Sequence, residues 1–278
     1  MAVSQKRLLI GLALLTLVVG ALFYRMTMTE PLAVLNATSK APVTSLPDFE
    51  QYQDVKAKKQ AFFDFLRPII KEQNDFIRAQ RVQVSQYAEQ FKQGNTFSEQ
   101  DLEVLQAYAE AYDLDEQPFE ADFFAVLLRR VDVIPPSLAL AQAAIESGWG
   151  SSRFAKEGNN LFGHWCFSKG CGFVPLGRDD NKYHEVAKFK TVNEAVRKYM
   201  RNLNAYHPYT PMRQIRLAQR TQQQAVTGLV LIHGLLDYSQ MKDQYIAKVV
   251  RMIKQNKLTR YDDAIAVTDQ SMAKASVE

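Results

Sequence analysis

A single carboxylate, Glu146, stands at the end of an apolar run in the middle of this chain of 278 residues. If a helix begins near Pro136 or Ser137, the apolar residues recur at the three- and four-residue spacing of a buried stripe. Glu146 then lies at the margin of this stripe, one turn after Gln142. Burial disfavours the charged form of a carboxyl group and raises its pKa, so the position suits a general acid that protonates a leaving oxygen. The stripe consists of Leu138, Ala141, Gln142, Ile145 and Trp149.

The same position also has a plainer interpretation. A glutamate near the C-terminal end of a helix is usually a solvated residue next to the negative end of the helix dipole. The surrounding motifs favour catalysis instead: residues 146–150 read Glu-Ser-Gly-Trp-Gly, and residues 159–163 read Asn-Asn-Leu-Phe-Gly. Together they resemble the signature of glycoside hydrolase family 73, the bacterial glucosaminidases that include autolysins. The chain is most similar to the Bax-type members from Gram-negative bacteria.

This resemblance extends over residues 135–256, with a weaker Bax-type likeness at residues 62–74. Lytic transglycosylases also carry a Glu-Ser pair, so the longer run makes the match specific. The resemblance implies a lysozyme-like fold with Glu146 as the catalytic acid. It also implies peptidoglycan glycan strands as the substrate.

The composition fits a folded protein, because 47% of the residues are hydrophobic. The length allows one large domain or two small ones. The net charge of +4 is spread along the chain, and no arginine-rich run occurs. We therefore expect no nucleic-acid partner.

The N-terminus predicts a membrane segment. Lys6 and Arg7 precede an uncharged apolar run at residues 8–24, and no Ala-x-Ala site ends it. We expect an uncleaved signal anchor at residues 1–25 in the inner membrane, although a cleaved signal peptide remains the alternative. A proline-containing tether at residues 26–50 would follow, with the remainder of the chain in the periplasm.

The remaining pattern predicts a mainly α fold with a small β lobe. We expect a helical region at residues 51–130, a glucosaminidase domain at 131–260 and a disordered tail at 261–278. The helical region is also a candidate surface for an envelope protein partner, through residues 52–130. A strand is expected at residues 182–189, and a helix is expected to start at Thr221. Pro68 could divide the first of the other expected helices, which are at residues 52–91, 98–112, 119–130, 191–204 and 239–255.

The two cysteines, Cys166 and Cys171, are the only ones in the chain. In an exported protein a disulfide is the default. A metal site is the alternative, but His164 is the only nearby imidazole, which leaves too few ligands for zinc. We therefore expect no metal and no cofactor.

A glycosidase usually needs a second group besides the acid. Glu185 is the only charge on one face of the expected strand and is the first candidate, with an edge-strand charge as the alternative interpretation. Asp179 and Asp180, in the loop before it, are rivals. The 2-acetamido group of the substrate could also replace a protein nucleophile. Relatives place their second acidic residue further upstream, which counts against Glu185.

Tyr238 matches a tyrosine that lines the active site in the family, so we include it among the catalytic candidates, with a buried structural tyrosine as the alternative. Of the aromatic residues near the motifs, we expect Trp149 and Phe162 to be core and Trp165 to lie nearer the cleft. Candidate substrate-binding residues are Gln142, Ser147, Trp149, Asn160, Phe162, Trp165 and Asp180.

The sequence therefore predicts an endo-β-N-acetylglucosaminidase that cuts on the reducing side of N-acetylglucosamine. The position of the cut rests on the resemblance alone. A muramidase or lytic transglycosylase is one alternative, and a non-catalytic peptidoglycan-binding protein is another.

Overall fold

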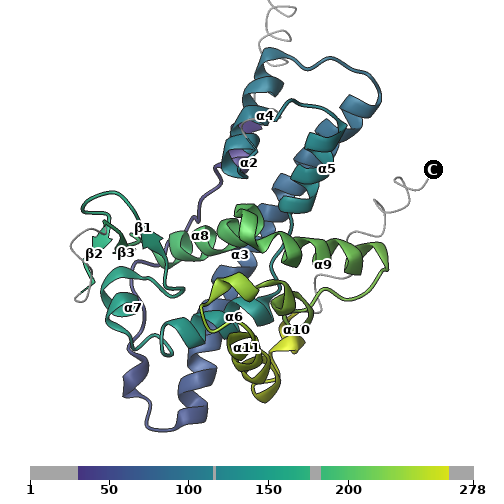
Figure 1. Cartoon of the computed structure of the whole chain (residues 1–278). Coiled ribbons are helices and arrows are strands. Elements are labelled where there is room, and N and C mark those ends of the chain that lie inside the picture. The colour runs from purple at the N-terminus through teal and green to yellow at the C-terminus, as the bar shows by residue number, and fades with distance from the viewer. Residues whose placement is uncertain (1–30, 115–116, 176–182, 263–278) are drawn as a thin grey trace, which may run out of the picture.

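A computed structural model describes residues 31–114, 117–175 and 183–262 of the chain. The fold is mainly helical with one small sheet, as the sequence predicts (Figure 1). The predicted signal anchor, Asp179, Asp180 and residues 263–278 lie outside the described residues. Within the described part, no helix combines the length and the apolar character needed to span a bilayer.

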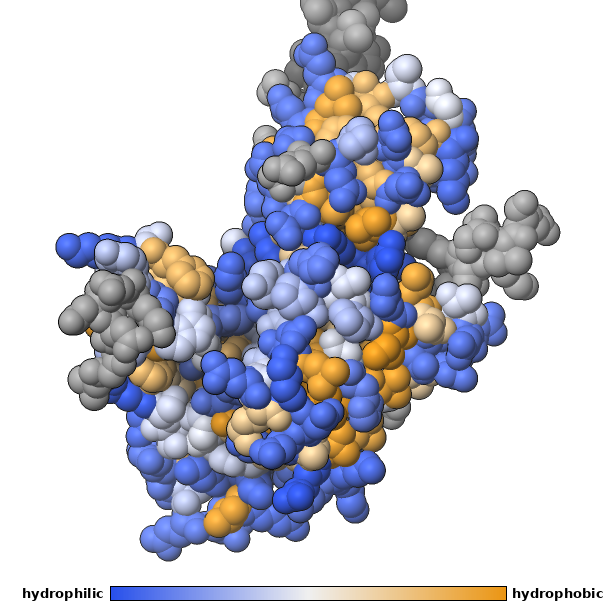
Figure 2. All heavy atoms as spheres, viewed as in Figure 1, coloured by the Kyte–Doolittle hydropathy of each residue, from blue (hydrophilic) through white to orange (hydrophobic). Residues whose placement is uncertain are grey.

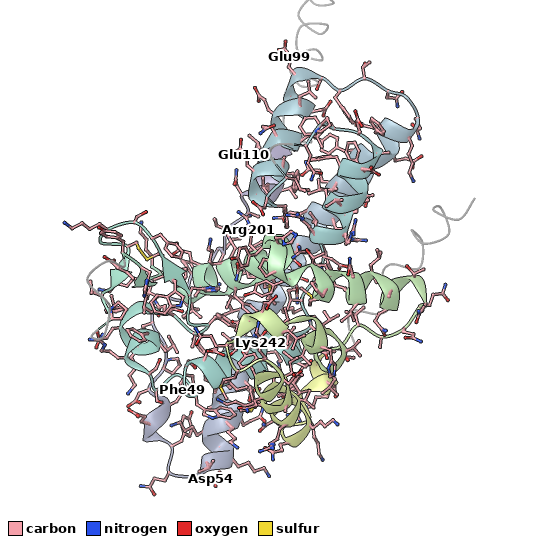
Figure 3. The ribbon with its side chains drawn as sticks, viewed as in Figure 1. Phe49, Asp54, Glu99, Glu110, Arg201 and Lys242 are labelled. Carbon is pink, nitrogen blue, oxygen red and sulfur yellow. A yellow bond between two sulfur atoms is a disulfide. The ribbon has the colours of Figure 1, made fainter. Side chains whose placement is uncertain are left out.

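The longest element is α3 (Val55–Lys92), which runs behind the other helices for much of the height of the molecule (Figure 1). Asp54 caps its N-terminus by accepting a hydrogen bond from the backbone N–H of Ala57 at 2.7 Å. Pro68 lies inside α3 without dividing it. Asp54 and Glu99, at the start of α4, mark opposite ends of the molecule (Figure 3).

Three further helices lie around the C-terminal half of α3. They are α2 (Pro31–Leu35), α4 (Glu99–Ala111) and α5 (Ala121–Arg130). Ser98 and Asp101 form the predicted capping box at the start of α4. The opposite half of α3 packs against α6 (Pro136–Glu146) and α8 (Val192–Ala205), and one hydrophobic core joins both halves.

The helix that carries Glu146, α6, lies at the centre of the molecule (Figure 1). It packs against α3, α10 (Gly228–Leu231), α11 (Asp243–Gln255) and η5 (Leu258–Tyr261). Gly228 allows α10 to approach closely, because an added Cβ would lie 2.4 Å from Oγ of Ser137. The described helical elements not yet named are α7 (Arg153–Gly158), α9 (Thr210–Thr221) and the short turns η1 (Phe49–Gln51), η2 (His207–Tyr209), η3 (Ile232–Gly234) and η4 (Leu236–Tyr238).

The β lobe projects beside α7 and α8 at the left of Figure 1. It holds a three-stranded antiparallel sheet in the order β1-β3-β2. The strands are β1 (Trp165–Cys166), β2 (Gly172–Phe173) and β3 (Glu185–Ala187). The strand expected at residues 182–189 is therefore shorter, and the edge-strand interpretation of Glu185 is wrong because β3 is central.

The predicted tether is wrong for its described part. Leu35 and Phe49 are buried in the core. The backbone of Val43 also pairs with the start of α8: its oxygen accepts from the N–H of Val192 at 2.8 Å, and its N–H donates to Oδ1 of Asn193 at 2.9 Å. Apolar side chains spaced along this stretch attach it to the body, so it does not act as a spacer.

Two predicted boundaries near the C-terminus also change. The chain does not start a helix at Thr221, which is the last residue of α9. Its hydroxyl donates to the carbonyl oxygen of Leu217 inside that helix at 3.0 Å. Asp262, which the sequence assigns to a disordered tail, is buried at the N-terminus of α6.

Candidate active site

Glu146 is the last residue of α6, and the residues after it turn the chain sharply away. Gly148, Trp149 and Gly150 all have positive φ, at 58°, 63° and 77°. Ser147 fixes this turn, because its hydroxyl donates to the carbonyl oxygen of Ala143 at 2.6 Å and accepts from the N–H of Gly150 at 2.8 Å. Ser147, a predicted substrate-binding residue, is fully buried and stabilises the turn; its contact with substrate stays a prediction.

The carboxyl group of Glu146 is half-buried between the C-terminal helix and the Asn-Asn-Leu-Phe-Gly loop. Its Oε1 accepts a hydrogen bond from the phenol of Tyr245 at 2.7 Å. Its Oε2 faces Gly163, where an added Cβ would lie 3.7 Å away. Burial raises the pKa of Glu146, although the Tyr245 hydrogen bond and the charge of Lys248 oppose that rise. The raised pKa favours the protonated form that a general acid requires.

A chain of hydrogen bonds connects this carboxyl group to the core. The hydroxyl of Tyr199 donates to Oε1 of Gln142 at 2.7 Å, and Nε2 of Gln142 donates to the phenol oxygen of Tyr245 at 3.0 Å. Tyr245 then donates to Glu146. Gln142, a predicted substrate-binding residue, is fully buried and uses both ends of its amide for these bonds; its contact with substrate stays a prediction. It orients the tyrosine that holds the acid.

Sequence reasoning missed Tyr199 and Tyr245. Tyr245 follows Tyr238 by seven positions in the segment that suggested Tyr238, and that proximity was the available signal. Tyr238 donates to the carbonyl oxygen of Phe162 at 3.3 Å and stacks on Tyr245, with ring centroids 5.4 Å apart. Tyr238 therefore acts on Glu146 indirectly, by stacking on the tyrosine that donates to its carboxyl group.

The Asn-Asn-Leu-Phe-Gly loop is fixed by its own side chains. The amide nitrogen of Asn160 donates to the carbonyl oxygens of His164 and Ala187, both at 2.9 Å, and its oxygen accepts from the N–H of His164 at 3.0 Å. Phe162 is buried and stacks on Tyr199 with centroids 4.0 Å apart. Asn160 and Phe162 are both buried, and their predicted contacts with substrate stay predictions. Their contacts hold Gly163 beside Glu146.

The two tryptophans lie in different environments. Trp149 is partly buried and packs against the core, with its ring centroid 5.7 Å from that of Phe62 and 5.3 Å from that of Phe63 on α3. This place agrees with the expectation that Trp149 is a packing residue, while its contact with substrate stays a prediction. Trp165, on β1, is 48% exposed.

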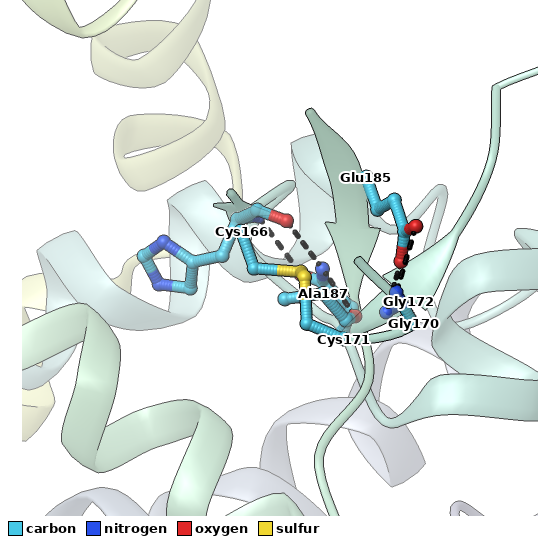
Figure 4. Close-up of a disulfide and its surroundings, with 8 residues drawn as sticks. Cys166, Gly170, Cys171, Gly172, Glu185 and Ala187 are labelled. Atoms are coloured by element: carbon cyan, nitrogen blue, oxygen red, sulfur yellow. Dashed lines mark hydrogen bonds between the residues drawn. A yellow bond between two sulfur atoms is a disulfide. The ribbon is translucent and has the colours of Figure 1, made fainter. Parts of the chain in front are cut away.

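Glu185 does not present its carboxylate to solvent, since the residue is only 4% exposed. Its Oε1 accepts from the N–H of Gly170 at 3.0 Å and its Oε2 from the N–H of Gly172 at 2.8 Å (Figure 4). The expectation that it faces the cleft is therefore wrong. His184 comes directly before β3, so in an extended chain its side chain points to the side opposite Glu185. Its ring centroid lies 4.4 Å from that of Trp165.

The predicted disulfide between Cys166 and Cys171 is confirmed (Figure 4). It closes the same loop that Glu185 anchors, and the three side chains lie together. Because each sulfur is bonded to the other, neither is a thiolate able to bind a metal. The cluster is a structural cross-link of the β lobe.

The other end of α6 is held by the C-terminal part of the chain. Oδ1 of Asp262 accepts from the backbone N–H of Ser137 at 2.9 Å, and its Oδ2 accepts from the hydroxyl of Ser137 at 2.5 Å. A carboxylate suits this place, because the N-terminus of a helix has unpaired N–H groups and a partial positive charge. Asp262 therefore caps the helix that carries the acid.

Comparisons with known proteins identify the family of this chain. The family described as "Mannosyl-glycoprotein endo-beta-N-acetylglucosaminidase" matches residues 121–258. Protein bax of Escherichia coli (strain K12) is 32% identical over 220 residues, covering 78% of this chain and 77% of that protein. Exo-glucosaminidase LytG of Bacillus subtilis (strain 168) is 36% identical over 94 residues, which are 32% of this chain and 32% of that protein.

Among solved structures, the catalytic domain of the autolysin Auto from Listeria monocytogenes aligns with 82% of this chain and 93% of that domain, with a TM-score of 0.39 and 18% identity. The family match covers the acid and the elements around it, and the relative from Escherichia coli extends over most of both chains. The chain therefore belongs to the Bax-type glucosaminidase family of glycoside hydrolases.

Proposed function

We propose that this protein is a peptidoglycan hydrolase of lysozyme-like fold, in which Glu146 is the general acid. The proposed reaction is endo cleavage of the β-1,4 bond on the reducing side of N-acetylglucosamine. The observation that carries the proposal is the half-buried carboxyl group of Glu146, oriented by Tyr245 at 2.7 Å and bordered by Gly163. The name of the Bacillus subtilis relative, an exo-glucosaminidase, supports the sugar specificity.

In this mechanism the two oxygens of Glu146 have different tasks. Oε2, beside the exposed Gly163, carries the proton to the departing oxygen of the glycosidic bond. Proton donation leaves a carboxylate, and the Tyr245 hydrogen bond to Oε1 stabilises that charge. Gln142 and Tyr199 keep the phenol of Tyr245 directed at the acid. Tyr238 supports the ring of Tyr245 by stacking on it.

For the second catalytic group we propose the 2-acetamido carbonyl of the substrate, which attacks the anomeric carbon as in other substrate-assisted glycosidases. The support for this choice is that both oxygens of Glu185 already accept backbone hydrogen bonds inside the β lobe. A thiazoline analogue of N-acetylglucosamine, which mimics the cyclic intermediate, should then inhibit competitively. Absence of inhibition at concentrations that inhibit a known substrate-assisted glucosaminidase would contradict this route.

The proposed place of action is outside the cytoplasm, at the periplasmic side of the inner membrane. The support is the sequence itself, where Lys6 and Arg7 precede the apolar run at residues 8–24. An envelope partner for residues 52–130 is a further prediction. Part of that region also has a structural role, because Phe62 and Phe63 of α3 pack on Trp149 in the turn that follows Glu146.

The decisive experiment combines the Glu146→Gln variant with analysis of the product ends from purified sacculi. A positioned general acid contributes roughly 10²–10⁴-fold, so we expect at least that loss, with cooperative unfolding retained. Glu157→Gln is the matched control, because Glu157 is exposed on α7. The wild-type products should end in reducing N-acetylglucosamine. A reducing N-acetylmuramic end would indicate a muramidase, an anhydro end would indicate a transglycosylase, and binding without cleavage would indicate a non-catalytic protein.

A further inference from the structure

The β lobe exposes several aromatic side chains that the catalytic mechanism does not use. Trp165 is 48% exposed, and Phe167 and Tyr183 are 79% and 77% exposed. Figure 2 shows hydrophobic surface on this lobe, which projects at the left of the view. Aromatic faces in such positions have a large apolar area to offer a ligand. Of the three, Trp165 is distinguished by its place relative to the acid.

Trp165 lies two residues after Gly163, the glycine that borders Oε2 of Glu146. An extended chain rises about 3.3 Å per residue, so the backbone of Trp165 lies within about 7 Å of that glycine. One sugar ring can bridge a distance of this size. A glycan whose scissile bond sits at Glu146 therefore has the indole within reach of a neighbouring sugar.

The indole is also held in place. Trp165 pairs with Val186 of β3, and the ring of His184 meets it edge to face at 4.4 Å. The next residue, Cys166, is cross-linked to Cys171. Glu185 fixes the intervening loop through its hydrogen bonds to Gly170 and Gly172 (Figure 4). A side chain on such a support loses little conformational entropy when a ligand binds.

We propose that Trp165 is a saccharide-binding residue that stacks on the apolar face of the N-acetylhexosamine next to the scissile bond. His184, the disulfide and Glu185 are its positioning groups. This inference rests on the proposed function, because it takes the peptidoglycan glycan strand as the ligand. It gives the β lobe a role in substrate affinity and gives Glu185 a task other than catalysis.

The chain contains only two tryptophans, which permits a direct test. The full-length Glu146→Gln protein is labelled with 5-fluorotryptophan, and the resonance of Trp165 is assigned with a Trp165→Phe variant. The probe is a purified tetrasaccharide of alternating N-acetylglucosamine and N-acetylmuramic acid, freed of peptide. We expect saturable displacement of the Trp165 resonance, while the resonance of Trp149, packed on α3, moves much less.

Affinity and kinetics complete the test. Trp165→Ala should weaken tetrasaccharide binding about tenfold or more by calorimetry. In the active protein it should raise KM more than it lowers kcat, because it removes binding shared by the ground state and the transition state. Phe167→Ala is the control, since Phe167 is more exposed and lies in the same lobe. Circular dichroism confirms that each variant is folded.

The outcomes separate the two levels of inference. Tetrasaccharide binding with an unmoved Trp165 resonance and unchanged affinity of Trp165→Ala would overturn the subsite and leave the proposed function standing. Failure of the Glu146→Gln protein to bind the tetrasaccharide would overturn both. Equal loss of affinity in Phe167→Ala and Trp165→Ala would replace the single subsite with a diffuse apolar surface, which also contradicts the inference.

Discussion

The phenol of Tyr245, on the last long helix, donates a 2.7 Å hydrogen bond to Oε1 of Glu146, at the end of the central helix. The two residues are 99 positions apart in the sequence. The bond works against the effect of burial, because it stabilises the ionised carboxylate whereas desolvation stabilises the neutral acid. The pKa of Glu146 is raised on balance, and Tyr245 limits how far it rises.

The Tyr245→Phe variant should therefore shift the pH profile in a defined direction. The proposed acid works when protonated, so activity falls as the pH increases through the pKa of Glu146. Loss of the phenol removes a contact that lowers this pKa, and the alkaline limb of kcat/KM should move to higher pH. The maximum kcat should fall about tenfold or more, because a hydrogen bond to a charged group contributes about 1.5–3 kcal/mol.

Tyr108→Phe is a suitable control for this profile. Tyr108 also donates a partly buried hydrogen bond, to Gln83 at 2.7 Å, but from α4, away from the acid. It should leave the alkaline limb in place. An alkaline limb of Tyr245→Phe that moves to lower pH would contradict the assigned role of the phenol.

The Glu185→Gln variant separates an anchoring role from a catalytic one. A glutamine in this place keeps one acceptor but turns an N–H₂ group toward a backbone N–H of Gly170 or Gly172. The mismatch should lower the free energy of unfolding by about 1–3 kcal/mol, measured by urea denaturation. The kcat should stay within roughly threefold of wild type, because the variant leaves the acid and its partners intact.

Glu157→Gln again provides the matched control, since Glu157 is exposed on the neighbouring helix α7. It should change neither quantity. A fall in kcat of about 10²-fold or more for Glu185→Gln, without a change in stability, would show that Glu185 takes part in the reaction.

Local pattern explains what the sequence could predict. The apolar stripe and the glycines identify α6 and Glu146, and the capping box identifies α4. The same reasoning fails at Thr221, where a similar pattern follows the end of α9. A threonine followed by polar residues can stand at the start or at the end of a helix. Only the packing of α9 shows that Thr221 stands at an end.

Contacts between distant segments explain what the sequence could not predict. The direction of Glu185 depends on the position of β3 between β1 and β2 and on the loop closed by the disulfide. The partner of Glu146 depends on how α11 packs against α6. Gln142 belongs to the apolar stripe and Asn160 to the Asn-Asn-Leu-Phe-Gly motif, but their partners show that both support the site from inside.

Gly163 should be sensitive to a single added methyl group. Its φ is +68°, and the Cβ of an alanine would point at Oε2 of Glu146 from 3.7 Å. The positive φ alone costs alanine about 1–2 kcal/mol. The methyl group would also occupy the space through which the glycosidic oxygen reaches the proton. We expect Gly163→Ala to lower kcat/KM on sacculi about tenfold or more.

Gly94→Ala isolates the contribution of backbone strain. Gly94 has a similar φ of +73°, no neighbour within 4 Å of an added Cβ, and a position between α3 and α4, away from the acid. It should lose similar stability and keep its activity. Equal kcat/KM values for the two alanine variants would show that the methyl group at residue 163 does not obstruct the reaction.

Asp262 should stabilise the catalytic helix from its opposite end. Replacement by alanine removes both hydrogen bonds to Ser137 and the favourable charge at the N-terminus of α6. Because this cap is buried, the loss should be about 1–2 kcal/mol of the free energy of unfolding, measured by urea denaturation.

Asp243→Ala is the matched control, since Asp243 is an exposed aspartate in the first turn of α11 and that helix has no side-chain cap. The control should cost less than about 1 kcal/mol. Equal effects of the two substitutions would mean that Asp262 contributes no specific support to the helix that carries Glu146.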